Sequence, residues 1–110
     1  MPKAKVGTVE YKQELLSALR SQSAAAEYLR ASLEDGDPKV FLLALRDVAE
    51  SRGGIGALAR ETKLNRENLY RMMSPSGNPS FGSLAVVLRA IGLRLSVENS
   101  VSKKGRRKAW

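Results

Sequence analysis

The pattern of apolar and polar positions along the chain predicts helices over most of its length. Thr8 is a suitable N-cap for a first helix, in which Tyr11, Leu15, Ala18 and Leu19 recur on one face. A second helix is expected over about 24–34, with its own apolar stripe. These spacings are typical of amphipathic helices that bury one side against a shared core.

A third helix is predicted to begin at Pro38 and to run to about 52. Asp37 can cap it, and proline suits a first helical turn because its φ is preset and it has no N–H that needs a partner. The glycine pair at 53–54 ends the helix, since glycine tolerates the left-handed conformation found just past helix ends.

Three shorter helical units follow. The first is expected over 55–61, the second over 65–73, and the third over 80–91, with Ser80 as its cap. The segment 74–79 is rich in serine, proline and glycine and therefore predicts a turn.

One segment near the C-terminus predicts a strand. Residues 93–98 alternate between apolar and polar with a period of two, which is typical of a half-buried strand. A lone strand needs a partner, and the simplest partner is the same strand of a second subunit. Leu93, Leu95 and Val97 are therefore predicted to form a dimer contact.

The predicted fold class is all-α, a bundle of about five to six helices with one short C-terminal β-strand. A chain of 110 residues has room for one compact domain. The predicted parts are a flexible N-terminal arm (1–7), a single domain (8–100) and a basic disordered tail (101–110). The expected segments of the domain are the N-terminal helices (8–52), a helix-turn-helix (55–73), a following helix (80–91) and the strand (93–98).

The charge of the chain is unevenly distributed. The net charge is +8, from 19 Lys and Arg against 11 Asp and Glu, and segments 1–5 and 103–108 supply +7 of it. Residues 6–51 have 5 basic and 8 acidic side chains, whereas 52–102 have 7 basic and 3 acidic. This asymmetry indicates two surfaces with different partners, of which the basic one suits phosphate groups. The alternative is that the basic ends serve solubility and the interior difference arose by chance.

Missing residue types exclude several kinds of function. The chain has no histidine and no cysteine, so imidazole and thiol catalysis and the commonest zinc ligands are absent. A Gly-x-Gly-x-x-Ala match at 54–59 follows a predicted helix rather than the strand that a dinucleotide site needs. The acidic group at 34–37 is better explained by cap and turn positions than by metal binding. We therefore expect no enzyme activity, metal or cofactor.

The chain also lacks signals for a membrane or for export. Its longest apolar run, 40–45, is far shorter than the roughly 20 residues of a membrane helix. The first residues carry charge without an apolar segment behind it, unlike a secretory signal. These observations predict a soluble, cytoplasmic binding protein with no membrane contact.

Segment 55–72 predicts a helix, a short turn and a second helix. The positions that would fill the corner between the two helices are apolar: Leu58, Ala59, Leu64, Leu69 and Met72. Ala59 is small enough for two helices to cross closely, and Asn65 can cap the second helix. This arrangement is the helix-turn-helix, whose second helix enters the major groove of DNA.

The polar residues around that second helix suit DNA readout. Arginine can bind guanine, asparagine can bind adenine and glutamate can accept from cytosine, while flanking residues hold phosphates. The predicted DNA-binding residues are Arg60, Lys63, Asn65, Arg66, Glu67, Asn68, Tyr70, Arg71, Asn78 and Ser80. Arg66 and Arg71 are the first choices for base contacts. The alternative is an ordinary corner of two helices with a solvated polar face.

At this point the sequence resembles a known family. From about 24 to 98 it is similar to the antidote proteins of HigA-type toxin–antitoxin modules, which belong to the lambda-repressor-like (Xre) helix-turn-helix class. The matching stretches are YLRASLEDGDP (28–38), FLLALRDVA (41–49), ALARET (57–62), NLYR (68–71), GNPSF (77–81) and LRAIGLRLSV (88–97).

This resemblance implies a homodimeric antitoxin. Such a protein binds and neutralises a RelE/HigB-like ribonuclease toxin, and it represses its own operon at a palindromic site in double-stranded DNA. One position departs from the class: the turn often begins with a glycine at positive φ, where this chain has Lys63. A non-glycine residue in that conformation costs about 1 kcal/mol, which a fold can tolerate.

The acidic N-terminal part is the predicted toxin face. A ribonuclease that grips RNA is itself basic, so an acidic surface would attract it. Glu27, Tyr28, Glu34 and Asp35 are the residues predicted to contact the toxin. The alternative is that 6–51 only completes the core, and the runner-up function is a stand-alone Xre-type transcriptional repressor without a toxin.

Overall fold

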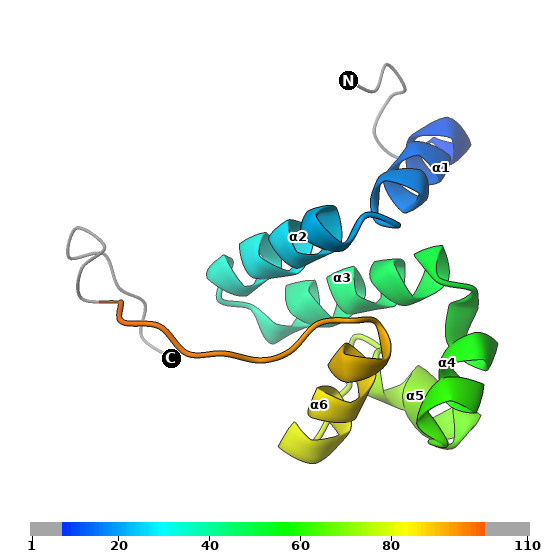
Figure 1. Cartoon of the computed structure of the whole chain (residues 1–110), viewed down its shortest axis with the longest axis vertical. Helices are drawn as coiled ribbons and strands as arrows, with labels where there is room; N and C mark the ends of the chain where they lie inside the picture. Colours follow the sequence, from blue (N-terminus) through cyan, green and yellow to red (C-terminus); the bar gives the residue numbers. More distant parts are fainter. Residues whose placement is uncertain (1–7, 101–110) are drawn as a thin grey trace.

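The computed structural model describes residues 8–100, and all of the regular secondary structure in that part is α-helix (Figure 1). Its six helices are α1 (Val9–Ala18), α2 (Gln22–Glu34), α3 (Pro38–Ser51), α4 (Gly54–Thr62), α5 (Arg66–Met72) and α6 (Phe81–Ala90). The prediction of about five to six helices is confirmed. The predicted arm 1–7 and tail 101–110 lie outside the described residues.

Polar side chains set most of the helix starts. The hydroxyl or carboxylate of Thr8, Asp37 and Ser80 accepts a backbone N–H from the first turn of α1, α3 and α6, as predicted. Helix α2 begins at Gln22, two residues before the expected start, because Ser21 caps it by accepting the backbone N–H of Ala24 at 3.2 Å.

Helix α3 is the centre of the molecule. It packs against α1, α2 and α4, and its Leu45 and Val48 are completely buried. Leu69 of α5 and Val87 of α6 reach the same core and are likewise fully buried. The elements that hold the predicted DNA-binding residues are thus fixed to one continuous apolar core.

Two polar side chains tie the start of the chain to its end. Arg52, at the end of α3, donates from one nitrogen to the carbonyl oxygen of Leu19 at 3.1 Å and from another to that of Ile91 at 3.2 Å. The Gln22 amide donates to the carbonyl oxygen of Gly92 at 3.1 Å. These bonds satisfy backbone oxygens at the ends of α1 and α6, which have no partner within their own helices.

The predicted strand at 93–98 is wrong: within the described residues this segment pairs with no other. Gly92, with φ +83°, ends α6, and only Leu93 packs against the core. Leu95 is 37% exposed and Val97 is 97% exposed. Alternation alone does not make a strand, because an extended segment also needs a neighbour for its backbone hydrogen bonds.

Candidate nucleic-acid interface

Helices α4 and α5 meet in a corner at the place of the predicted helix-turn-helix. Helix α4 ends at Thr62, and its C-cap Lys63 is the only non-glycine residue with positive φ (63°) among residues 8–100. The Thr62 hydroxyl donates to the carbonyl oxygen of Leu58 at 2.8 Å and accepts the backbone N–H of Leu64 at 3.1 Å. It thereby holds the turn between the two helices, a role that the sequence analysis did not assign.

The inner side of this corner is apolar, as predicted. Leu69 is fully buried, and Leu58 and Met72 are nearly so. Ala59 and Leu64 are partly buried against the same core. These contacts fix the seven-residue helix α5, which is too short to be stable by itself.

The outer side of α5 presents the predicted base-reading residues to solvent. Exposed side chains on this helix are Arg66, Glu67, Asn68, Tyr70 and Arg71. Asn65 precedes them as the N-cap and accepts the backbone N–H groups of Glu67 at 2.7 Å and Asn68 at 3.3 Å. The Asn65 side-chain oxygen is therefore engaged in capping.

The two arginines of α5 are held differently. Arg71 donates to the side-chain oxygen of Asn68 at 3.1 Å, so these two side chains form one polar unit. The Arg66 guanidinium lies over Gly56 of α4, where an added β-carbon would be 3.6 Å from its nearest nitrogen. Arg66 thus lies along the start of α4, whereas Arg71 is oriented by its own helix.

A hollow of about 370 Å³ lies between α5 and the loop that follows it. Four of the predicted DNA-binding residues line it: Asn68, Arg71, Asn78 and Ser80. The loop can approach α5 this closely only because residue 77 is glycine. A β-carbon there would lie 2.1 Å from the carbonyl oxygen of Met72, a distance that no side chain tolerates.

The remaining predicted residues surround this site. Arg60, at the end of α4, and Lys63 are exposed. The Ser80 hydroxyl caps α6 by accepting the backbone N–H of Ser83 at 3.1 Å, and it also donates to the Ser83 hydroxyl. Within residues 8–100, no Lys or Arg from position 52 onward forms an ion pair with a carboxylate. Apart from Arg52, which is bonded to two backbone carbonyl oxygens, these cations are open to a partner.

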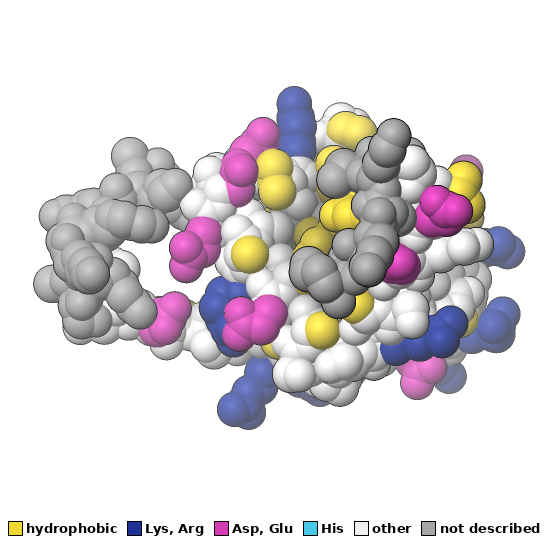
Figure 2. All heavy atoms as spheres, turned by 90° about the horizontal axis from the view of Figure 1, so that it is seen from above, with side chains coloured by type: hydrophobic (Ala, Val, Ile, Leu, Met, Phe, Trp, Pro, Cys, Tyr) yellow, Lys and Arg dark blue, Asp and Glu magenta, His cyan; other side chains and the backbone are white. Residues whose placement is uncertain are grey.

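The predicted toxin contacts lie on α2, on the other part of the molecule. Glu27 and Glu34 are exposed, and so is Asp35, the C-cap of the helix. Glu27 pairs with Arg30 one turn away, at 2.8 Å. Figure 2 views the molecule from the side of α1 and α2 and shows acidic side chains spread among apolar ones.

Tyr28 differs from the other three because it is only partly exposed. Its ring packs against the core, and its hydroxyl donates to a carboxylate oxygen of Asp47 at 2.7 Å. Lys12 donates to the other oxygen of Asp47 at 3.5 Å and pairs with Glu50 at 3.2 Å. Tyr28 therefore joins α2 to α3 through Asp47, and Lys12 joins α1 to α3 through Asp47 and Glu50.

These contacts shift two pKa values. Burial, followed by the hydrogen bond to Asp47, raises the pKa of Tyr28 well above its usual 10.0, because a phenolate would be poorly solvated and would face a carboxylate. The hydrogen bond to Glu50 raises the pKa of Lys12 above its usual 10.5. Both groups keep their protons at neutral pH.

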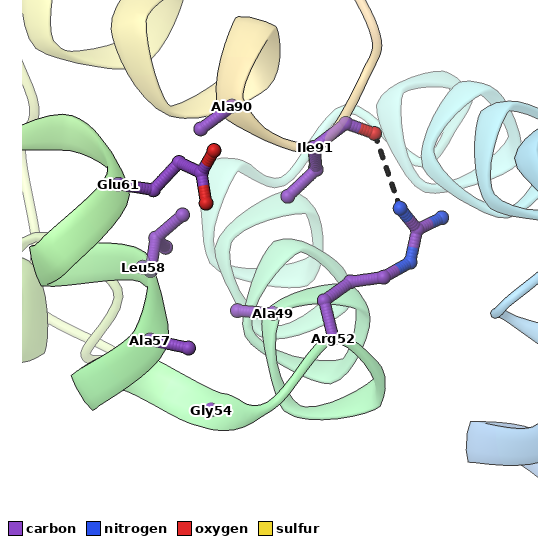
Figure 3. A pocket seen from close by; sticks show the side chains of 8 residues that line it. All are labelled: Ala49, Arg52, Gly54, Ala57, Leu58, Glu61, Ala90 and Ile91. Atoms are coloured by element: carbon purple, nitrogen blue, oxygen red, sulfur yellow. Dashed lines mark hydrogen bonds between the residues drawn. The ribbon is translucent and has the colours of Figure 1, made fainter.

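A second hollow, of about 160 Å³, lies where α3, α4 and α6 meet (Figure 3). Arg52 and Glu61 line it, with the apolar side chains of Leu58 and Ile91 between them. The Arg52 Nε is buried there without a hydrogen-bond partner. Across residues 8–100, no group of three or more acidic side chains is placed to hold a metal, and no helix is long and apolar enough to span a membrane.

Comparison with known proteins identifies the family. The model of a family described as "Probable addiction module antidote protein" matches residues 10–99. The chain belongs to this family. An uncharacterized protein of Haemophilus influenzae (strain ATCC 51907 / DSM 11121 / KW20 / Rd) is 33% identical over 82 residues, which cover 74% of this chain and 84% of the relative. No solved structure matches the chain.

Membership in the addiction module antidote family indicates an antidote role, which in general implies a toxin as partner. The resemblance noted from the sequence is confirmed at the level of the antidote class. Its finer assignments, to HigA-type proteins and to the Xre class of helix-turn-helix, stay predictions.

Proposed function

We propose that the chain is a DNA-binding antitoxin of a type II toxin–antitoxin module. In this function it neutralises a RelE/HigB-like ribonuclease toxin by binding it, and it represses its own operon. Residues 8–100 act as one unit that offers two separate surfaces, one to each partner.

The observation that carries the DNA-binding part is the corner of α4 and α5. Its turn at Lys63, its buried Leu69 and its exposed polar α5 have the geometry of a helix that docks in a major groove. The hollow beside α5 brings Arg71 and Asn78 to one place, where base and phosphate contacts would meet. Unpaired cations around it favour an anionic partner.

The proposed operator is palindromic, so two copies of the chain are needed. Each copy supplies one α5, and the two helices lie in successive major grooves about one helical turn apart. Leu95 and Val97 are exposed, which is compatible with the predicted contact of 93–97 with a second copy.

The toxin is proposed to bind the part of the molecule formed by α1 and α2. Residues 8–51 have a net charge of −3, which would steer a basic ribonuclease toward them. Glu27, Glu34 and Asp35 supply exposed carboxylates there. Tyr28, which is partly exposed, also holds α2 against α3 through its bond to Asp47.

Fluorescence anisotropy with the promoter fragment upstream of the operon tests the DNA surface. The double variant Arg66→Ala/Arg71→Ala should lose about 4 kcal/mol of discrimination between operator and random DNA, because each bidentate arginine contributes 1–3 kcal/mol. The control Arg20→Ala/Arg30→Ala removes the same charge from the other part of the chain and should keep full discrimination. An unchanged operator preference in the first variant would show that α5 is not the reading helix.

A stand-alone repressor is the other candidate function. The family match favours the antitoxin, since an antidote requires a toxin. Production of the chain together with the protein encoded beside it distinguishes the two functions. A stable complex with a basic neighbour of about a hundred residues supports the antitoxin, whereas a chain that elutes alone supports the repressor.

A further inference from the structure

The hollow of about 160 Å³ between α3, α4 and α6 is lined by none of the residues assigned to DNA or toxin contacts. It exists because four of the positions around it have little or no side chain: Ala49, Gly54, Ala57 and Ala90. A cavity of about 150 Å³ holds a molecule of the size of benzene. This hollow therefore has room for a ligand of roughly six to eight non-hydrogen atoms.

Arg52 brings a positive charge to the edge of this hollow. Two of its nitrogens donate to the carbonyl oxygens of Leu19 and Ile91, which are neutral acceptors. Its Nε is buried without a hydrogen-bond partner, and no carboxylate within residues 8–100 pairs with the guanidinium. A carboxylate would supply both the missing acceptor and the missing countercharge. Gly54, which also lines the hollow, begins a helix that has no side-chain cap, so the positive end of α4 favours an anion as well.

Glu61 brings the opposite charge to another side of the hollow. It lies two turns after Gly54 on α4, which is about 10 Å along the helix axis. In Figure 3 the apolar side chains of Leu58 and Ile91 lie between its carboxylate and the Arg52 guanidinium. Glu61 makes no hydrogen bond or ion pair in the described part of the chain. Its carboxylate is therefore open to the ammonium group of a ligand.

This arrangement of charges favours one class of small molecule. A simple anion would be attracted by Arg52 but repelled by Glu61, and a simple amine would meet the reverse. An α-amino acid has both charges, but its two charged groups are joined to one carbon and are too close together to reach both residues. A short amino acid with its charges at opposite ends of a methylene chain matches both residues and the apolar surface between them.

We propose that this hollow binds a short ω-amino acid, with its carboxylate at the Nε of Arg52 and its ammonium group at Glu61. The methylene groups between them contact Leu58 and Ile91. Because α3, α4 and α6 all contribute to the hollow, the bound molecule stabilises the packing of these three helices. The site lies outside the two surfaces of the proposed function and does not depend on them.

Isothermal titration calorimetry of the full chain with 5-aminopentanoate tests the site. A ligand of this size with both charged ends engaged should bind with a dissociation constant below about 1 mM. At about 10 mM it should also raise the midpoint of thermal unfolding, because it binds the folded state. Its isomer 2-aminopentanoate has the same atoms with both charged groups on one carbon, whereas pentanoate and pentylamine have one charge each. All three should bind at least about tenfold more weakly.

Two pairs of variants locate the ligand in this hollow. Glu61→Gln keeps the shape of an exposed side chain but removes its charge, and it should raise the dissociation constant of 5-aminopentanoate about tenfold. Glu34→Gln makes the same change at an exposed acid of α2 and should leave the constant unchanged. Ala57→Leu fills the hollow and should abolish binding, whereas Ala85→Leu, on α6 and outside this hollow, should not affect it.

The proposal is overturned if 5-aminopentanoate gives neither heat of binding nor a rise in the unfolding midpoint. It is also overturned if 2-aminopentanoate binds equally well, or if Glu61→Gln binds like the wild type. The Glu61 pair of variants keeps the test decisive even if Ala57→Leu does not fold, because residue 61 is exposed. The measurement contains neither DNA nor toxin, so its failure is distinct from failure of the proposed function.

Discussion

The two parts of the chain use their charged side chains in opposite ways. All three ion pairs within residues 8–100 lie before position 52, where Lys12 pairs with Asp47 and Glu50, and Arg30 pairs with Glu27. From position 52 onward no cation has a carboxylate partner in the described part, although the net charge there is +4. Charge serves the fold in the first part, whereas in the second part only Arg52 among the cations is bonded to distant backbone and the exposed ones are open to a partner.

This difference shows why net charge alone is a poor guide to function. The acidic part has more charged groups, but several are committed to one another. The basic part has fewer, but Arg60, Lys63 and Arg71 are exposed on neighbouring elements. What a charged surface can do depends on which of its charges are already satisfied.

Arg52 belongs to both parts, and its loss should have the largest effect on stability. Arg52→Met removes two charge-assisted hydrogen bonds and leaves the carbonyl oxygens of Leu19 and Ile91 unpaired. We expect a loss of about 2–3 kcal/mol in the free energy of unfolding, measured by urea denaturation. Arg20→Met, at an exposed arginine, should change it by less than about 0.5 kcal/mol. Equal stability of both variants would mean that the two parts are not joined through Arg52.

Tyr28 tests the claim that polar groups of the first part serve the fold. Tyr28→Phe removes the hydrogen bond to Asp47 and should cost about 1–2 kcal/mol at pH 7. The pKa of Tyr28 is raised in the folded state, so its contribution is fully present below about pH 10, the usual value, and is lost as the pH rises through the folded value. Denaturation at increasing pH should therefore show a steeper loss above pH 10 in the wild type than in Tyr28→Phe.

The control for this prediction is Tyr70→Phe, because Tyr70 is exposed and makes no hydrogen bond through its hydroxyl in residues 8–100. Its alkaline profile should match that of the wild type. The stability of the wild type and of both tyrosine variants includes the contribution of Lys12. Because the pKa of Lys12 is raised above its usual 10.5, this contribution is also lost as the pH rises. A Tyr28→Phe profile as steep as the wild type would contradict the role assigned to this phenol.

Lys63 tests the opposite claim, that cations of the second part are kept for a partner. Lys63→Gly relieves the positive φ of 63° and should stabilise the fold by about 0.5–1 kcal/mol. The same change should weaken operator binding and reduce the dependence of log Kd on log salt by about 1. The control is Lys63→Ala, which keeps the strained positive φ but removes the charge. It therefore separates the effect of backbone strain from the effect of charge.

A gain in stability with unchanged DNA affinity would show that Lys63 is only a tolerated residue of the turn. A loss of DNA affinity in both variants, with a gain in stability in the glycine variant alone, would confirm that fold and function make conflicting demands at this position.

Sequence patterns predicted what local chemistry determines. The caps at Thr8, Asp37 and Asn65 and the apolar corner around Leu69 follow from neighbouring residues, and the structure confirms them. The positive φ at Lys63 was expected only from the family resemblance, and the structure shows it as well. Helix starts and turns depend on hydrogen bonds that span two to four residues, which a single sequence displays directly.

Contacts between distant residues could not be predicted in this way. Arg52 bonds backbone atoms 33 and 39 positions away, and no local signal marks it as a junction. The close approach of Gly77 to Met72 likewise depends on the path of a whole loop. The strand at 93–98 failed for the same reason, since its pattern says how side chains alternate but not whether a neighbouring strand exists.

The small size of α5 has a consequence for how recognition can diversify. Only Leu69 and Met72 of its seven residues are buried, and the other five are exposed. Under the proposed function, substitutions at the exposed positions would alter which DNA sequence is preferred without disturbing the core. Duplicated copies of such a chain within one genome can become insulated from one another through a few changes on this helix, while their shared architecture stays the same.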